Sequence, residues 1–174
     1  MGSRITIRRA RPEDTAAIGA INAAGQPGVA PLTPVEMAAI AAGTLRCWVA
    51  DDSAAVLGYL IAYAAGDAYD GEEFAWFGRR YPALLYVDQI AVAPAGRRRG
   101  IGSALYAAAR AAAVAEGHAA FTCEVNLDPP NPISPRFHDQ LGFHEVGVLR
   151  TADGRTVVLL RLPSPAVGGA STST

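Results

Sequence analysis

The sequence predicts an α/β (α+β) domain in which one mixed, mostly antiparallel sheet of about seven strands carries helices on both faces. Two observations predict this class. Strand-like and helix-like runs alternate along the chain, and near each end two strand-like runs are separated only by a short turn sequence. The chain has 174 residues, 51% of them hydrophobic, which is enough for one sizeable core. We therefore expect a single domain over residues 1–163.

The individual elements follow from the spacing of apolar residues and from the residues that begin and end helices. For example, Thr33-Pro34-Val35-Glu36 has the form of a capping box. The expected helices are residues 11–25, 33–43, 103–116 and 137–141. The expected strands are residues 4–8, 47–50, 56–63, 84–92, 120–125, 145–149 and 156–162, of which 84–92 should be buried on both faces. Residues 66–82 are expected to form an irregular insertion, and residues 164–174 a disordered tail.

Composition excludes several kinds of protein. A formal net charge of −1 gives no overall field for holding nucleic acid or an anionic membrane, so neither partner is expected. All 15 basic residues are arginine, which excludes a lysine nucleophile, a Schiff-base lysine and a Walker-type phosphate lysine. Cys47 and Cys123 lack disulfide-framework or metal-site spacing, so we interpret them as core residues, with a reactive role as the alternative. Residues 4–8 lack the apolar core of a signal peptide, which predicts a cytoplasmic protein.

The stretch Arg97-Arg98-Arg99-Gly100-Ile101-Gly102-Ser103 lies where an expected strand gives way to an expected helix. Such a turn exposes the first backbone N–H groups of the helix, and the helix dipole adds positive potential there. Glycine at 100 and 102 lets a ligand approach the backbone, and guanidinium groups donate forked hydrogen bonds, which together suit a pyrophosphate. A dinucleotide fingerprint would need glycine where Leu105 stands, and a P-loop would need a lysine, so both are excluded. A solvated basic turn remains the open alternative.

Two segments resemble the GNAT superfamily of N-acetyltransferases. Residues 97–102 are similar to its R/Q-x-x-G-x-G/A acyl-CoA pyrophosphate loop, and residues 131–143 are similar to its N-x-x-A-x-x-L-Y-x-x-x-G-F segment. The resemblance covers about residues 4–162 and implies the acyl-CoA N-acyltransferase fold with acetyl-CoA as cofactor. It also implies that two strands, ending at Val92 and near Val125, splay apart to admit pantetheine, which pairs with the first like an added strand. The cofactor-binding residues so implied are Ile90, Ala91, Val92, Arg97, Arg98, Arg99, Gly100, Ile101, Gly102, Ser103, Asn131, Ser134 and Phe137.

The catalytic residues are less clearly marked. The family often has a tyrosine, its usual proton donor to the departing CoA thiolate, where this chain has His138. Histidine can also donate a proton, or it can simply pack beside the following glycine turn. An amine arrives as an ammonium ion and must lose a proton, so a carboxylate near the cleft would help. Asp88, within an apolar strand, is the first candidate for this base and Glu124 the second. An arginine partner for Asp88 and a solvent-facing Glu124 are the structural alternatives.

The acceptor site is expected near the insertion that contains Asp67, Tyr69, Asp70, Glu73 and Trp76, where the family commonly builds its acceptor wall. Acids with aromatics suit a cationic amine, through charge pairing and cation–π contact. The alternative is a solvated loop whose aromatic residues pack into the core or against a second copy in a homodimer. The expected acceptor-binding residues are Tyr69, Trp76, Tyr86 and Asn126. We favour a small-molecule amine over a protein amino terminus as the acceptor.

Three classes of function remain open. The first is an enzyme that moves an acetyl group from acetyl-CoA to a primary amine by direct attack in a ternary complex. The second is an acyl-CoA-binding module without catalysis, which the histidine at position 138 makes worth testing. The third is an interaction domain that binds no CoA. An enzyme should release thiol from acetyl-CoA, and a binding module should bind acetyl-CoA without releasing thiol. An interaction domain should show no thermal shift with acetyl-CoA.

Overall fold

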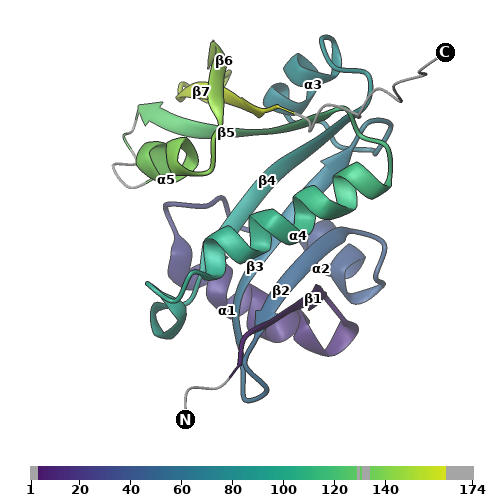
Figure 1. Cartoon of the computed structure of the whole chain (residues 1–174), viewed down its shortest axis with the longest axis vertical. Coiled ribbons are helices and arrows are strands. Elements are labelled where there is room, and N and C mark those ends of the chain that lie inside the picture. The colour runs from purple at the N-terminus through teal and green to yellow at the C-terminus, as the bar shows by residue number, and fades with distance from the viewer. Residues whose placement is uncertain (1–3, 129, 131–133, 164–174) are drawn as a thin grey trace, which may run out of the picture.

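The chain folds around one seven-stranded sheet in the order β1-β2-β3-β4-β5-β7-β6, in a computed structural model that describes residues 4–128, 130 and 134–163 (Figure 1). The strands are β1 (Thr6–Arg9), β2 (Arg46–Asp51), β3 (Val56–Ala64), β4 (Leu84–Val92), β5 (Ala120–Asp128), β6 (His144–Arg150) and β7 (Thr156–Leu162). The helices are α1 (Thr15–Gly25), α2 (Pro34–Ala41), α3 (Glu72–Gly78), α4 (Ile101–Ala115) and α5 (Ser134–Gln140). The seven expected strands and the four expected helices are thus confirmed, with ends that differ by a few residues.

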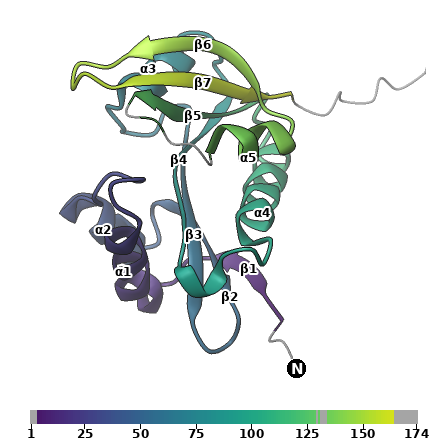
Figure 2. The same ribbon diagram turned by 90° about the vertical axis from the view of Figure 1, so that its left-hand side faces the viewer.

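The sheet divides at its centre. All neighbouring strands are antiparallel except β4 and β5, which run parallel and pair only over Leu84–Val87 and Ala120–Cys123. Beyond that point β4 continues along β3, and β5 continues along β7. The two strands therefore diverge, and Figure 2 shows β5, β7 and β6 turning away from the plane that β2, β3 and β4 share.

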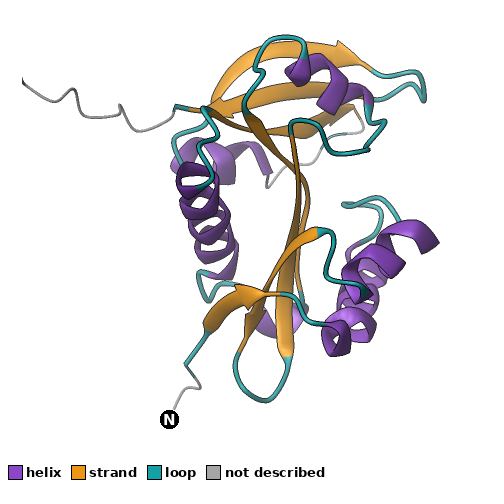
Figure 3. Cartoon of the chain, turned by 90° about the vertical axis from the view of Figure 1, so that its right-hand side faces the viewer, coloured by secondary structure: helices purple, strands orange, loops and turns teal. Residues whose placement is uncertain are grey.

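Helices cover both faces of the sheet, as Figures 2 and 3 show, with α1 and α2 on one face and α4 on the other. Ile18 of α1 and Ile40 of α2 belong to one buried cluster, which also contains Phe77 of α3. Leu105 of α4 belongs to the second cluster, with Phe143 after α5. Burial of these two apolar layers is the main force that holds the helices on the sheet. The expected fold class is confirmed.

Local sequence explains where the helices begin. The Thr33 hydroxyl accepts a hydrogen bond from the Glu36 N–H at 3.2 Å, and the Glu36 carboxylate accepts the Thr33 N–H at 2.7 Å. This reciprocal pairing is the predicted capping box, and it fixes the first turn of α2. At the start of α4, Gly100 has a φ of +73°, a left-handed conformation that glycine adopts without strain.

Several sequence expectations need comment. Residues 66–82 are not wholly irregular, because α3 forms within them and buries Phe74 and Phe77. Strand β4 is buried in its first half, while residues 90–92 are partly exposed where β5 has moved away. Cys47 and Cys123 are free and buried, one in each core cluster, as interpreted. The expected tail at 164–174 lies outside the described residues.

None of the helices in the described part of the chain has the length and apolar character that a membrane span requires.

Candidate functional site

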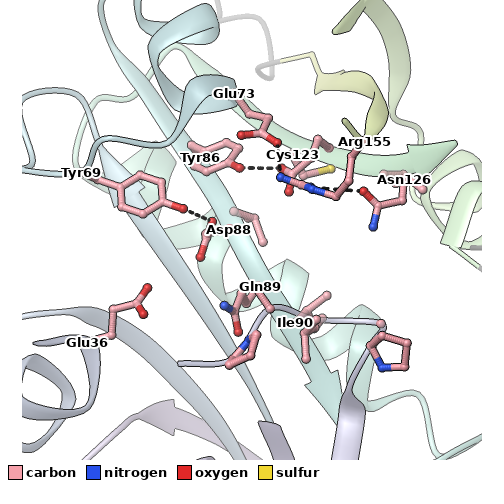
Figure 4. A pocket seen from close by; sticks show the side chains of 18 of the residues that line it. Glu36, Tyr69, Glu73, Tyr86, Asp88, Gln89, Ile90, Cys123, Asn126 and Arg155 are labelled. Carbon is pink, nitrogen blue, oxygen red and sulfur yellow. Dashed lines mark hydrogen bonds and ion pairs between the residues drawn. The ribbon is translucent and has the colours of Figure 1, made fainter. Parts of the chain in front are cut away.

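A cavity of about 490 Å³ lies where β4 and β5 diverge. Its walls come from β4 and β5, from residues 27–33 before α2, from the segment leading into α3, and from the turn between β6 and β7. Figure 4 shows side chains from these separate segments gathered around one space. The division of the sheet therefore collects polar groups from several distant parts of the sequence, including Tyr106 of α4 and His138 of α5.

Each diverging strand contributes one carboxylate that accepts a hydrogen bond from a tyrosine (Figure 4). The Tyr69 hydroxyl donates to Oδ1 of Asp88 on β4 at 2.6 Å. The Tyr86 hydroxyl donates to Oε2 of Glu124 on β5 at 2.6 Å. The two candidate bases predicted from the sequence thus lie in the same cavity, each held by an aromatic residue predicted for the acceptor site.

The surroundings shift the proton affinity of both carboxylates. Burial raises the pKa of Asp88 to about 6, although the hydrogen bond from Tyr69 favours the charged form. Burial, and then the charge of Asp88, raise the pKa of Glu124 well above its usual range. A carboxylate that exchanges its proton near neutral pH is suited to acid–base work.

Further charged side chains surround this pair. The other carboxylates that line the cavity are those of Glu36, Asp70, Glu73 and Asp153. Arg155 is the one cationic side chain among the described lining residues, and it donates to Glu73 at 3.2 Å, to Asp153 at 2.8 Å and to Asn126 at 3.3 Å. Because these contacts occupy its guanidinium group, the excess carboxylates leave the cavity attractive to a cation.

His138 lines the inner wall of the cavity, where α5 meets α4. Its side chain is 3% exposed, and Nε2 lies 2.7 Å from the hydroxyl oxygen of Tyr106 on α4. The rings of Phe137 and Phe143 pack edge-on against the imidazole. Tyr106 was not predicted as a lining residue, because an apolar-facing position in an alanine-rich helix is typical of ordinary packing.

The start of α4 has the features expected of an anion site. The N–H groups of its first residues have no acceptor within the helix, by helix geometry. A Cβ at Gly100 would have nothing within 4 Å, so glycine serves the backbone conformation there. A Cβ at Gly102 would lie 3.0 Å from Cζ of Phe137, so this glycine permits close packing of α4 against α5. That packing role differs from the ligand-approach role expected for Gly102.

The three arginines beside this helix start are exposed. Arg98 has a φ of +60°, an uncommon conformation for a non-glycine residue. Nη1 of Arg99 lies 3.5 Å from Oδ2 of Asp52, which is a weak ion pair at an exposed site. All three arginines are therefore exposed, in the segment that leads directly into α4.

The remaining predicted cofactor residues divide into three groups. Ile90 lines the cavity, and Ala91 and Val92 continue the same strand while pairing with β3. Within the described residues, β5 supplies no partner for the other edge of β4 beyond Val87. Ile101 is buried at the start of α4, Ser103 is exposed there, and Phe137 packs against Gly102. Asn131 lies outside the described residues, as does the side chain of Ser134.

The predicted acceptor residues do not all meet at the cavity. Tyr69, Tyr86 and Asn126 line it. Trp76 does not: a Cβ at Gly147 of β6 would lie 2.8 Å from its ring, and the Arg80 guanidinium carbon lies 3.6 Å above the ring. Trp76 therefore packs within the molecule, as the alternative to acceptor binding expects.

Three charged lining residues outside the predicted insertion were not singled out as site residues. Glu36 was identified only as a capping residue, and nothing in the sequence indicates that its side chain faces a cavity. Asp153 and Arg155 lie in a turn that the sequence predicted, but only the pairing of β7 with β5 brings that turn to the cavity. No group of three His, Cys, Asp or Glu side chains suitable for a metal ion occurs in residues 4–128, 130 and 134–163.

The sequence model of the Acetyltransferase (GNAT) family matches residues 17–143 of the chain. A search of curated proteins found no match.

Solved structures of similar fold were also found. An N-acetyltransferase from Staphylococcus aureus Mu50 has a TM-score of 0.70 at 23% identity, over 92% of this chain and 99% of that chain. The ribosomal-protein-S18-alanine N-acetyltransferase from Escherichia coli has a TM-score of 0.70 at 19% identity, over 96% and 98%. The yncA protein from Salmonella typhimurium, solved with its cofactor acetyl-CoA, has a TM-score of 0.68 at 20% identity, over 97% and 99%. At these identities the similarity is one of fold.

Proposed function

The chain belongs to the Acetyltransferase (GNAT) family, and from this premise we propose that it transfers the acetyl group of acetyl-CoA to a primary amine of a small molecule. The observation that carries the proposal is the pair of carboxylates, Asp88 and Glu124, on the two strands that diverge around one cavity. The acceptor would attack directly, with both substrates bound at once.

The residues present fit acetyl-CoA. The edge of β4 over residues 88–92, which β5 leaves, would pair with the amides of pantetheine as an added strand. The N–H groups at 101–103 and the guanidinium groups of Arg97, Arg98 and Arg99 would bind the diphosphate. Bound in this way, acetyl-CoA supplies a thioester whose carbonyl carbon accepts the amine. A backbone N–H of β4 would stabilise the negative charge that develops on the carbonyl oxygen.

Asp88 would prepare the amine for attack. The acceptor arrives as an ammonium ion, drawn by the carboxylates of the cavity, and must lose a proton before its nitrogen can attack. With a pKa of about 6, Asp88 is charged at neutral pH and can take this proton directly or through a water molecule. Glu124, whose pKa burial also raises, would act mainly by binding the acceptor from the opposite strand. His138 remains the sequence-based candidate for returning a proton to the thiolate.

The acidic lining supports a cationic acceptor. Small amines, amino acids, polyamines, aminoglycosides and peptide amino termini are the classes to compare. The decisive experiment measures thiol release from acetyl-CoA with each class, together with the thermal shift that acetyl-CoA alone produces. We expect stabilisation by acetyl-CoA and thiol release with cationic small amines. Stabilisation without thiol release for any amine would favour the binding module, and no stabilisation would contradict both.

The diphosphate site has its own test. Replacing Arg97, Arg98 and Arg99 together by alanine should raise the KM for acetyl-CoA by about tenfold or more, because charge-assisted hydrogen bonds are lost. Replacing Arg4, Arg79 and Arg150, which are also exposed, is the matched control and should leave that KM unchanged. An equal KM in both triple variants would contradict the proposed diphosphate site.

A further inference from the structure

We propose that Tyr106, positioned by His138, is the residue that returns a proton to the sulfur of CoA as the acetyl group leaves. This assignment rests on the proposed acetyl transfer. It differs from the sequence-based hypothesis, in which His138 itself donates the proton.

The position of the Tyr106 hydroxyl supports the assignment. Tyr106 is 4% exposed, yet it lines the same cavity as Asp88 and Glu124, reached from the α4 face of the sheet. Beside it lies Cys123, the last residue of β5 that pairs with β4, so the hydroxyl lies next to the point where the strands begin to diverge. The thioester must reach this point if pantetheine runs along the free edge of β4 towards Asp88.

The surroundings of Tyr106 would favour protonation of a departing thiolate. The titratable side chains nearest to it are Cys123 and Glu124 from β5 and His138 from α5. The other neighbours are the rings of Phe121, Phe137 and Phe143. Burial raises the pKa of the Cys123 thiol well above its usual range. A departing thiolate against the same apolar wall would likewise be a stronger base than in water, which favours its protonation. Burial also raises the pKa of the Tyr106 hydroxyl well above its usual range, so a hydrogen bond from His138 to the tyrosine oxygen would be needed to stabilise the phenolate.

His138 is better placed to hold Tyr106 than to reach the sulfur. Its Nε2 is already engaged by the Tyr106 hydroxyl at 2.7 Å, and Phe137 and Phe143 cover the ring. With the hydrogen on Nε2, the imidazole would donate to the tyrosine oxygen and leave the hydroxyl hydrogen to point elsewhere. His138 is thus a positioning residue.

The protons of this step balance. The amine nitrogen forms the bond to the carbonyl carbon, and the carbon–sulfur bond breaks with its electron pair going to sulfur. The Tyr106 hydroxyl gives its proton to that sulfur, and the resulting phenolate is held by the Nε2–H of His138 until water in the cavity returns a proton. The ammonium loses two protons in all, the first to Asp88 and the second to water. The products are the amide, the CoA thiol and one released proton.

The test compares kinetics in variants of the full chain. Tyr106→Phe removes a single oxygen atom, and we expect kcat to fall about 100-fold while the KM for acetyl-CoA stays within about twofold. His138→Gln retains a donor group and should cost less than His138→Leu. The double variant Tyr106→Phe with His138→Leu should be no slower than Tyr106→Phe alone, because the two residues act as one unit. Tyr81→Phe, at a partly buried tyrosine outside the cavity lining, is the matched control.

The outcomes separate this assignment from the proposed function. If wild-type protein releases thiol and Tyr106→Phe keeps kcat within about twofold, or changes only the KM for acetyl-CoA, the assignment is overturned and acetyl transfer stands. If wild-type protein releases no thiol with any amine, both are overturned. Should Tyr106→Phe fail to fold, the two His138 variants decide. A lower kcat at unchanged KM, partly restored by glutamine, supports the pair, and unchanged kcat in both variants overturns it.

Discussion

The two walls of the cavity carry the same kind of hydrogen-bonded pair in different surroundings. On β4, Asp88 accepts a hydrogen bond from Tyr69. Tyr69 is partly exposed, and its ring stacks on that of Tyr63 with 3.9 Å between the ring centroids. On β5, Glu124 accepts from Tyr86, which is fully buried. Both bonds measure 2.6 Å, yet the pKa of Asp88 rises only to about 6, while burial and the charge of Asp88 raise that of Glu124 well above its usual range. Burial, more than the tyrosine partner, therefore controls the pKa of each carboxyl.

The largest expected effect comes from replacing the carboxylate of each diverging strand in turn by its amide. Asp88→Asn should lower kcat about 100-fold, because the amide cannot accept the ammonium proton. Glu124→Gln should lower kcat less than tenfold, because Glu124 is proposed to bind the acceptor and the amide oxygen keeps a hydrogen-bond acceptor there. Asp128→Asn, at an exposed carboxylate at the end of β5, is the control. Thiol release measures all three, and equal losses in the first two would refute the division of roles.

The next effect concerns pH. The Tyr69 hydrogen bond favours charged Asp88, so Tyr69→Phe should raise the pKa of that carboxyl above about 6 and move the acidic limb of kcat/KM to higher pH. Tyr86→Phe should move this limb less, because Tyr86 bonds Glu124. The profiles need an acceptor whose ammonium titrates well above this range. Identical limbs in both variants and wild type would contradict the assignment of the limb to Asp88.

A smaller effect should appear in stability. Because the pKa of Asp88 is raised in the folded state, folding retains a proton that the unfolded chain releases above about pH 4. The contribution of Asp88 to the free energy of unfolding therefore declines as pH rises from about 4 to 6, and Asp88→Asn removes this contribution. Relative to wild type, the variant should gain about 3 kcal/mol between pH 4 and pH 7 in urea unfolding. A constant difference between the two proteins would show that Asp88 titrates normally.

The smallest expected effect concerns Arg155, the cationic side chain that lines the cavity. Arg155 lowers the pKa of Asp88 by its charge, as a minor cause, and it spans Glu73 and Asn126. Arg155→Gln should raise the pKa of Asp88 slightly and shift the acidic limb by a few tenths of a pH unit. Arg150→Gln, at an exposed arginine on β6, is the control and should shift nothing. If Arg155→Gln shifts the acidic limb as much as Tyr69→Phe does, the charge of Arg155 affects the pKa of Asp88 as strongly as the Tyr69 hydrogen bond, which would contradict its minor role.

The sequence was sufficient for the elements that local rules govern. The capping box at Thr33 is set by neighbouring residues and was predicted. Gly100 was predicted to begin the turn into α4 by allowing a ligand to approach, whereas its left-handed conformation is a finding of the structure. Helix α3 was missed because its seven residues, Glu72–Gly78, offer too few turns for a periodic pattern. Tertiary packing of Phe74 and Phe77 stabilises it instead.

The site was predictable where a residue type conflicts with its setting. Asp88 stood out as a carboxylate in an apolar strand, and it does line the cavity. Tyr106 and Glu36 did not stand out, because tyrosine in a core-facing helix position and glutamate in a capping box both have ordinary structural uses. Their place at the cavity depends on how α4 and α2 pack on the sheet, which no local pattern encodes. The roles of all these residues remain predictions.

The contact between Gly102 and Phe137 links two parts of the site that the sequence separates by 35 positions. Phe137 precedes His138, so a bulkier residue at 102 would displace the aromatic ring and disturb the imidazole next to it. A substitution made there to weaken cofactor binding would therefore slow turnover as well. Under the two proposals, binding of the nucleotide and protonation of the thiolate would therefore both depend on this one contact between α4 and α5.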